Sequence, residues 1–455
     1  MPMQNPASRR RLRDLFNVRR DEVVPVLLAA FFFFCVLTAL MVLRPARDAL
    51  GMQRGIEAVR WLFVGTALVT LLVNPVFGWL VSRFRRLRFI AITYVFFALS
   101  LVGFHLLLAF APEAVGVASG QVFYVWFSVF NLFATMLFWA LMADRFSLDQ
   151  GKRFFALIAV GGTMGAIFGP WLASVLARPL GTPALLLVSA AFLLLALCAA
   201  WVVARTQSAN AGHAAGARHA ASPSHEPGVI GGSAWQGLKA VFRSRYLMGI
   251  AAYVIAMTIM ATLLYFTRLQ MVAALGDDTD MRTALFARID LVTQALTLLL
   301  QAFIAGRVMQ RFGVSLTLAL LPLTAALGFI GLAAVGTLAA LIVFEAAFRA
   351  IQRALTRPAR ETLYTVVSRE DKYKSKAFID TFGYRGGDVI GAQIEGLLAR
   401  LGMGLAGLVS VAVPLALAWA ALGWWLGRAQ QRLAIGTPST GSSDDGRDET
   451  PAGLP

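Results

Sequence analysis

Twelve hydrophobic windows divide the sequence, and each is long enough to cross a lipid bilayer as a helix. A helix rises about 1.5 Å per residue, so roughly 20 apolar residues cover the hydrocarbon layer. Hydrophobic residues make up 58% of the 455-residue chain and charged residues only 14%, which excludes a water-soluble protein of this size. The pattern therefore predicts an all-α integral membrane protein with twelve transmembrane helices. The windows cover residues 23–43, 59–81, 89–111, 117–143, 154–177, 183–204, 246–272, 283–305, 313–335, 337–357, 377–401 and 404–427.

The windows fall into two sets of six, separated by a segment of different composition. Residues 206–233 are rich in Ala, Gly, Ser, Pro and His and have no hydrophobic period, which predicts a flexible linker. The polar composition after Arg432 predicts a disordered end of the chain in the same way. The predicted organisation is an N-terminal tail (1–22), a six-helix bundle (23–205), a flexible linker (206–245), a second six-helix bundle (246–427) and a disordered C-terminal tail (428–455).

Lysines and arginines lie mainly on one side of this predicted layout. The formal net charge is +17, and thirty of the 41 basic residues fall in segments on the side of the two tails. Nine, including Arg268, fall on the opposite side, and two lie within spans. Cytoplasmic loops carry such an excess, so both tails and the linker are predicted to be cytoplasmic, with the spans in the plasma (bacterial inner) membrane. Because the cations lie in short loops between spans, they do not indicate nucleic-acid binding.

Two short repeats relate the two halves. A Gly-x4-Arg-Phe segment follows the second span of each half. Gly161 and Gly165 in the fifth span correspond to Gly387 and Gly391 in the eleventh, at nearly the same separation along the chain. Two parallel six-span repeats joined by a cytoplasmic linker resemble the major facilitator layout. That resemblance implies a central cavity between the halves, with every third span facing lipid.

The window at 377–401 carries four charges between apolar residues and glycines: Asp380, Arg385, Asp388 and Glu395. A charge at the middle of a bilayer costs roughly 2.5–3.5 kcal/mol on the insertion scale, so these side chains must face protein or a watered cavity. At about 100° per residue the three acids share one helical face, with the arginine at its edge. This face is predicted to belong to a transport pathway.

Three further charges, Glu345, Arg349 and Arg353, recur at intervals of four in the window at 337–357. Two interpretations are open: a structural ion-pair ladder with the window at 377–401, or substrate and gate groups. The planar guanidinium of arginine donates two charge-assisted hydrogen bonds to a phosphate or carboxylate. The arginines therefore favour an anionic or zwitterionic solute.

Charges also occur at the end of the first span and within the eighth. Arg44 and Arg47 either extend to the membrane interface or contact substrate. Asp48 and Asp290 join the other acids as candidates for coupling or gating, since a buried carboxyl group can hold a proton.

Several segments together resemble a known family, the bacterial and plastid ATP/ADP (nucleoside tri-/diphosphate) exchange translocases. The likeness covers most of both halves and excludes the linker and the tails. It implies a nucleotide antiporter of the major facilitator type. The segments that carry it are LRPARDAL at 43–50, YVWF at 124–127, FW at 138–139, KRFF at 152–155, RExxY at 360–364 and KxKAxID at 374–380.

The family's nucleotide-contacting charges are only partly kept. The resemblance implies a cationic contact at Arg47, followed by the matching Asp48, and the charge of Arg385 is retained. Asn131 stands at an acidic position of the family, and Asp388 stands where the family has a lysine.

The candidate site residues follow from the charges and from the resemblance. Substrate binding is assigned to Arg44, Arg47, Asn131, Arg349, Arg353 and Arg385. Coupling or gating is assigned to Asp48, Asp290, Glu345, Asp380, Asp388 and Glu395. No catalytic residue, metal site or cofactor is predicted, because the sequence contains no Ser/His/Asp set, no His/Cys cluster with metal spacing and no Walker-type loop.

The predicted function is secondary active transport of an anionic or zwitterionic solute, nucleotides included, by alternating access of two halves. The predicted partners are this solute and the lipid bilayer, with a proton as a candidate coupling ion. Two alternatives are open: a proton-coupled major facilitator exporter of a drug or metabolite, and a non-transporting membrane sensor or scaffold. Eight spans with polar stripes argue against the last alternative.

Overall fold

The structure is a computed structural model that describes residues 22–83, 86–146, 148–214, 234–303 and 305–435. The regular elements of these residues are helices. The first half contains α2 (Val23–Gly51), η1 (Met52–Arg54), α3 (Ile56–Arg83), α4 (Arg86–Phe110), α5 (Glu113–Arg145), α6 (Leu148–Leu180) and α7 (Thr182–Ala214).

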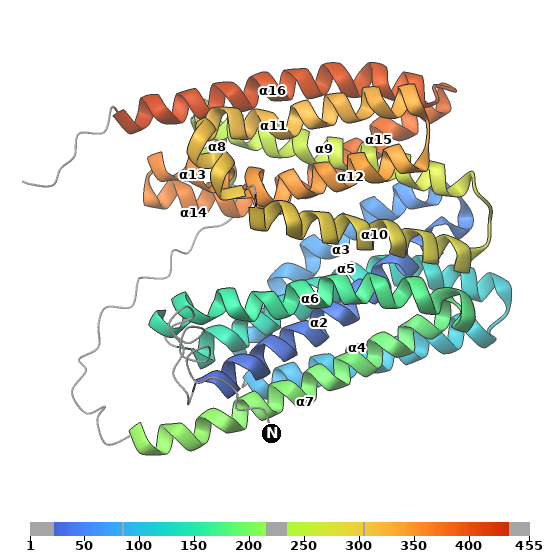
Figure 1. The fold of residues 1–455 in the computed structure, drawn as a ribbon, viewed down its shortest axis with the longest axis vertical. Coiled ribbons are helices and arrows are strands. Elements are labelled where there is room, and N and C mark those ends of the chain that lie inside the picture. The colour runs from blue at the N-terminus through green and yellow to red at the C-terminus, as the bar shows by residue number, and fades with distance from the viewer. Residues whose placement is uncertain (1–21, 84–85, 147, 215–233, 304, 436–455) are drawn as a thin grey trace, which may run out of the picture.

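The second half begins with a short helix and continues with six spans, two of which are interrupted (Figure 1). Its elements are α8 (Ala234–Arg243), α9 (Arg245–Ala273), α10 (Thr279–Phe303), α11 (Ala305–Val335), α12 (Leu338–Ile351), η3 (Gln352–Thr356), α13 (Arg357–Leu363), η4 (Tyr364–Val366), α14 (Arg369–Phe378), η5 (Ile379–Gly383), α15 (Tyr384–Arg400) and α16 (Leu405–Ile435).

Among the described residues, ten helices are long and apolar enough to cross a membrane, which confirms the all-α multi-pass fold. Helices suit the hydrocarbon layer of a membrane, because the backbone N–H and C=O groups of a helix form hydrogen bonds within the same segment. The other two predicted spans, 337–357 and 377–401, contain the π-helical turns η3 and η5. These two spans are therefore irregular close to their charged residues.

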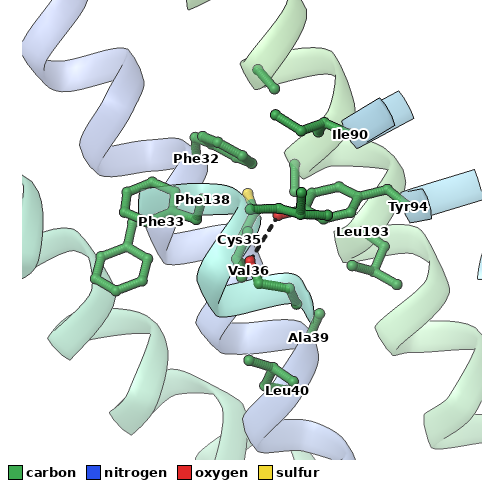
Figure 2. Packing of buried hydrophobic residues seen from close by; sticks show 14 of the residues in the cluster. Phe32, Phe33, Cys35, Val36, Ala39, Leu40, Ile90, Tyr94, Phe138 and Leu193 are labelled. Atoms are coloured by element: carbon green, nitrogen blue, oxygen red, sulfur yellow. Dashed lines mark hydrogen bonds between the residues drawn. The ribbon is translucent and has the colours of Figure 1, made fainter. Parts of the chain in front are cut away.

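Each half has a hydrophobic core of its own. In the first half, Phe32 and Phe33 of α2 pack against Phe138 of α5, with ring centroids 5.0 and 4.1 Å apart. Figure 2 shows this packing together with Tyr94 of α4, whose hydroxyl donates to the carbonyl of Ala134 at 3.2 Å. Aromatic rings thus fill the space where α2, α4 and α5 meet.

The glycine repeat places equivalent helices in close contact. A Cβ atom at Gly165 of α6 would lie 2.4 Å from the carbonyl oxygen of Phe34 in α2. In the second half, a Cβ atom at the corresponding Gly391 of α15 would lie 3.1 Å from the carbonyl oxygen of Ile259 in α9. The fifth span therefore packs on the first, and the eleventh packs on the seventh, through glycines at corresponding positions.

Helices occupy parts of the segments predicted to be flexible. The α7 helix continues to Ala214 and α8 begins at Ala234, so the predicted flexible linker (206–245) is wrong at both ends. The α16 helix continues to Ile435, so the first part of the predicted disordered tail (428–455) is helical. Extending an existing helix costs far less than starting one, which favours such continuations. The remaining residues of the linker and of both tails lie outside the described residues, apart from Glu22.

The first and last described helices define two ends of the molecule. The start of α2 and the end of α16 lie at the same end, on the left in Figure 1, which we call the tail side. The opposite end, where α6 turns into α7 at Gly181, is the far side. Gly181 has φ +80°, a backbone conformation that residues with a Cβ atom rarely adopt.

Polar contacts join the two halves on the far side. The backbone N–H of Thr182, the first residue of α7, donates to Asp280 of α10 at 2.6 Å, and the Thr182 hydroxyl donates to Thr283 at 2.9 Å. A carboxylate at a helix N-terminus accepts from an otherwise unsatisfied N–H and complements the helix dipole. Arg60 of α3 pairs with Glu395 of α15 at 2.7 Å. These contacts close the far side of the molecule.

The glycine contacts generate a stability prediction. Gly165→Leu is expected to lower the free energy of unfolding by about 1–3 kcal/mol, because the new side chain overlaps the α2 backbone. Thermal unfolding of the detergent-solubilised protein measures the effect. Gly103→Leu is the matched control, since no atom lies within 4 Å of a Cβ atom at that position of α4. Equal melting temperatures for the two variants would contradict the prediction.

Candidate functional site

A cavity of about 340 Å³ lies between the two halves. Its lining comes from α2, α3 and α5 of the first half and from α9, α12, η3 and α15 of the second. Among the described residues, α4, α7, α11 and α16 contribute nothing to it, as expected for lipid-facing spans. The charged lining residues are five arginines and two acids: Arg44, Arg47, Arg349, Arg353, Arg385, Glu345 and Asp388.

Beside this cavity, one arginine of α9 holds three acids. Arg268 is fully buried and contacts Asp48 of α2, Asp290 of α10 at 3.0 Å and Glu345 of α12 at 3.3 Å. Asp48 belongs to the first half and the other three residues to the second, so the cluster crosses the boundary between the halves. Each of the three acids is at most 2% exposed. Removing Arg268 would leave three buried carboxylates without this cation.

Two further arginines surround Asp290. Arg349 lies 3.1 Å from one carboxylate oxygen of Asp290 and also pairs with Glu345, one helical turn before it in α12. Arg44 of α2 lies 3.6 Å from the other oxygen of Asp290. Both arginines also line the cavity, so they contact the acid cluster on one side and face open space on the other.

The first half contributes an arginine that contacts aromatic rings. The Arg47 guanidinium pairs with Asp48 at 2.5 Å and lies 4.8 Å from the centroid of the Tyr124 ring. Tyr265 of α9 donates to Asp48 at 2.9 Å, and its hydroxyl lies 3.1 Å from that of Tyr124. Arg47 thus belongs to the cavity wall and is not exposed at the membrane interface.

The tail-side part of the cavity has fewer acidic partners. Arg353 donates to the neutral side chain of Gln294. Arg385 of α15 pairs with Asp388 at 3.4 Å and is 33% exposed. Asp388 also accepts from Thr262 at 3.4 Å.

The ion-pair ladder predicted between 337–357 and 377–401 is wrong. Glu345, Arg349 and Arg353 contact α9 and α10, and no described ion pair or hydrogen bond joins them to the charged residues in 377–401. The helical spacing places the three residues on one face, but it does not specify which neighbouring helix that face meets.

Three predicted site residues lie outside both the lining of this cavity and the Arg268 cluster. Asn131 is exposed on α5 and is not among the described lining residues. Glu395 is buried against Arg60 and Gln270 on the far side. Asp380 lies 3.4 Å from Arg360, near the tail side. The acids predicted to share one face of 377–401 therefore belong to three separate clusters along the span.

Arg268 is missed by the sequence-based assignment, which counts it with the basic residues of the far side and not with the candidate site residues. It lies within the predicted span 246–272 and continues the stripe of Thr258, Thr262 and Tyr265 at helical spacing. That spacing is the available signal, because a residue three positions after Tyr265 shares its face. Its depth in the structure results from the packing of α9 against α2, α10 and α12.

Taken together, the cavity and the adjoining cluster carry an excess of positive charge. Six arginines face four acids, which leaves a formal charge of +2. The six arginines are Arg44, Arg47, Arg268, Arg349, Arg353 and Arg385, and the four acids are Asp48, Asp290, Glu345 and Asp388.

A larger groove of about 930 Å³ lies between α3, α4 and α5. Its lining is apolar apart from Thr93 and Gln121 and contains no charged residue among the described ones. Such a surface is suited to lipid tails, so the charged cavity is the candidate functional site.

Solved structures of transporters resemble this chain in fold. A bacterial homolog of the human lysosomal transporter Spinster, in an inward-facing and unoccupied conformation, has a TM-score of 0.59 and 12% identity, covering 91% of this chain and 99% of that one. The POT family transporter PepTSo has a TM-score of 0.61 at 12% identity, covering 90% and 98%. The nucleoside transporter NupG, in a mutant form, has a TM-score of 0.52 at 13% identity, covering 90% and 99%.

No curated protein sequence matches the chain. A family profile does, over residues 26–343, and that range includes the first half and the helices α9, α10 and α11. With two six-span halves around a charged central cavity, the chain belongs to the Major Facilitator Superfamily.

Proposed function

We propose that this protein is a secondary active transporter that exchanges anionic solutes across the membrane by alternating access. The observation that carries the proposal is the excess of arginine in one cavity between the two halves, with five arginines and two acids in its lining. In a low-dielectric site this excess attracts anions and repels cations. Arginine also suits phosphate and carboxylate groups by its paired donors.

The arrangement of the halves supports alternating access. Asp280, Glu395 and their partners hold the far side together, and a second cavity of about 570 Å³ adjoins the central one toward the tail side. The described lining of that second cavity comes from the second half alone. Transport then requires the far-side contacts to break while the halves rock about the central cavity. The excess of basic residues in the tail-side loops supports a cytoplasmic tail side, and we propose the inner membrane as the membrane that the protein spans.

Nucleotides are the first anions to test. Tyr124, Tyr265 and Phe63 line the cavity next to Arg47, which places aromatic rings beside a cation. This combination suits a solute with both a ring and an anionic group. Asp388 distinguishes the site from that of the nucleotide exchangers that the sequence resembles, because its charge opposes that of the lysine there.

Arg385→Gln is expected to lower uptake of the transported anion at least about tenfold, since a charge-assisted hydrogen bond contributes roughly 1.5–3 kcal/mol. Arg385 is one-third exposed, and its one ion pair among the described residues is with Asp388, so the variant should fold. Uptake of labelled ATP, ADP, inorganic phosphate and glutamate into proteoliposomes measures the effect. Arg432→Gln, an exposed position on α16, is the control. Unchanged uptake in Arg385→Gln would remove this residue from the mechanism, and transport of cations alone would overturn the proposed function.

Asp388→Asn separates exchange from proton coupling. Asp388 competes with a bound anion for Arg385, so its neutralisation is expected to keep exchange and to lower the KM for the anion several-fold. Proteoliposomes preloaded with unlabelled substrate, with and without a pH gradient, provide the measurement. Uptake that needs a pH gradient but no internal substrate, and that Asp388→Asn abolishes, would favour a proton-coupled exporter. Saturable binding without flux in the unmodified protein would favour a sensor.

A further inference from the structure

The cavity of about 570 Å³ on the tail side of the central site is itself rich in arginine. We call it the vestibule. It shares Gln352, Arg353, Arg385 and Asp388 with the central cavity, so the two are continuous. Its remaining charged lining residues are Arg357, Arg360 and Asp380.

Both π-helical turns of the protein's described residues contribute to the vestibule. The η3 turn supplies Gln352 and Arg353, and the η5 turn supplies Asp380. π-turns are rare and occur often at functional sites. Two such turns, from different spans, place polar side chains in the wall of one cavity.

The vestibule acids are already paired, whereas two of its arginines are not. Asp380 pairs with Arg360 at 3.4 Å, and Arg360, which is 7% exposed, also donates to Tyr384 at 2.5 Å. Arg357 is exposed and has no ion pair with another described residue. Arg353 donates only to a neutral amide among the described partners. Arg353 and Arg357 therefore have no acid at ion-pair distance among the described residues.

The nearest additional acid is held by a lysine. Glu361 lies 2.5 Å from Lys376. Burial acts to raise the pKa of Glu361, but the hydrogen bond and the charge of Lys376 outweigh it, so this pKa lies below its ordinary value. Glu361 also lies 3.7 Å from Arg360, so its negative charge is shared between Lys376 and Arg360. Among the described residues, no ion pair joins Glu361 to Arg353 or Arg357.

We infer that the vestibule is a second anion-binding subsite, in which Arg353 and Arg357 hold a second anionic group of the solute. The inference rests on the proposed function of the central cavity. Arg349 and Arg357 are eight residues apart on one helical run, so the two anionic groups would be separated by roughly 10–12 Å. The solute class is thus a phosphate or carboxylate compound with two separated anionic groups.

Binding of single and double anions to the purified full-length protein tests the inference. Acetate and methyl phosphate are the single-anion probes, and dicarboxylates and α,ω-bisphosphates of two to ten carbons are the double-anion probes. Stabilisation against thermal unfolding reports the affinity. Long double anions are expected to bind at least about tenfold more tightly than single ones, because a second charge-assisted contact is added. Short double anions should show no such gain.

The Arg357→Gln variant is expected to bring the affinity ratio of long double to single anions close to one, and Arg432→Gln should leave the ratio unchanged. The inference is overturned if no chain length improves binding or if the gain survives Arg357→Gln. These results would leave the proposed function intact as long as single anions bind. If neither single nor double anions bind the unmodified protein, the proposed function fails and the inference fails with it.

Discussion

The burial of charge in a membrane protein is the constraint on which the rest of this site depends. An ion taken from water into a low-dielectric interior loses several kcal/mol of hydration, and only close partners of opposite charge compensate for it. Arg268 is fully buried and has three such partners, Asp48, Asp290 and Glu345. Three acids exceed the charge of one arginine, so further arginines lie around them. Arg44 and Arg349 therefore both line the cavity and help to neutralise the buried acids.

The Arg268 cluster joins the two halves, so it would be affected by the movement that the proposed transport requires. Arg268 and Asp48 belong to different halves, so relative movement of the halves changes their pairing. Among the described residues, one oxygen of Asp290 and one of Glu345 have no hydrogen-bond partner, although Arg44 lies 3.6 Å from that oxygen of Asp290. A buried polar atom without a hydrogen bond is costly, so these two oxygens are the least stabilised part of the cluster. An anion that pairs with Arg349 would release part of the charge that now holds Asp290 and Glu345.

The two halves are alike in packing and different in chemistry. Gly165 packs on α2 as Gly391 packs on α9, so the repeat determines which helices touch. The fifth span carries no charge at the positions of Arg385 and Asp388, where Ala159 and Gly162 stand instead. Both π-turns of the described chain also lie in the second half. The repeated part therefore provides the scaffold, and the second half supplies most of the residues that line the cavity.

The sequence by itself determined the class of fold, because in a bilayer an apolar run of about 20 residues must be a helix, and it marked the charged spans, because charges there need partners. It did not determine which partners these are. Arg349 and Arg353 meet α10 in place of the span at 377–401, and Glu395 meets Arg60 on the far side. Only the tertiary structure decided these pairings, and only the tertiary structure showed that Arg268 is fully buried. Helical periodicity defines a face of one helix, whereas the neighbour of that face depends on the packing of all the spans together.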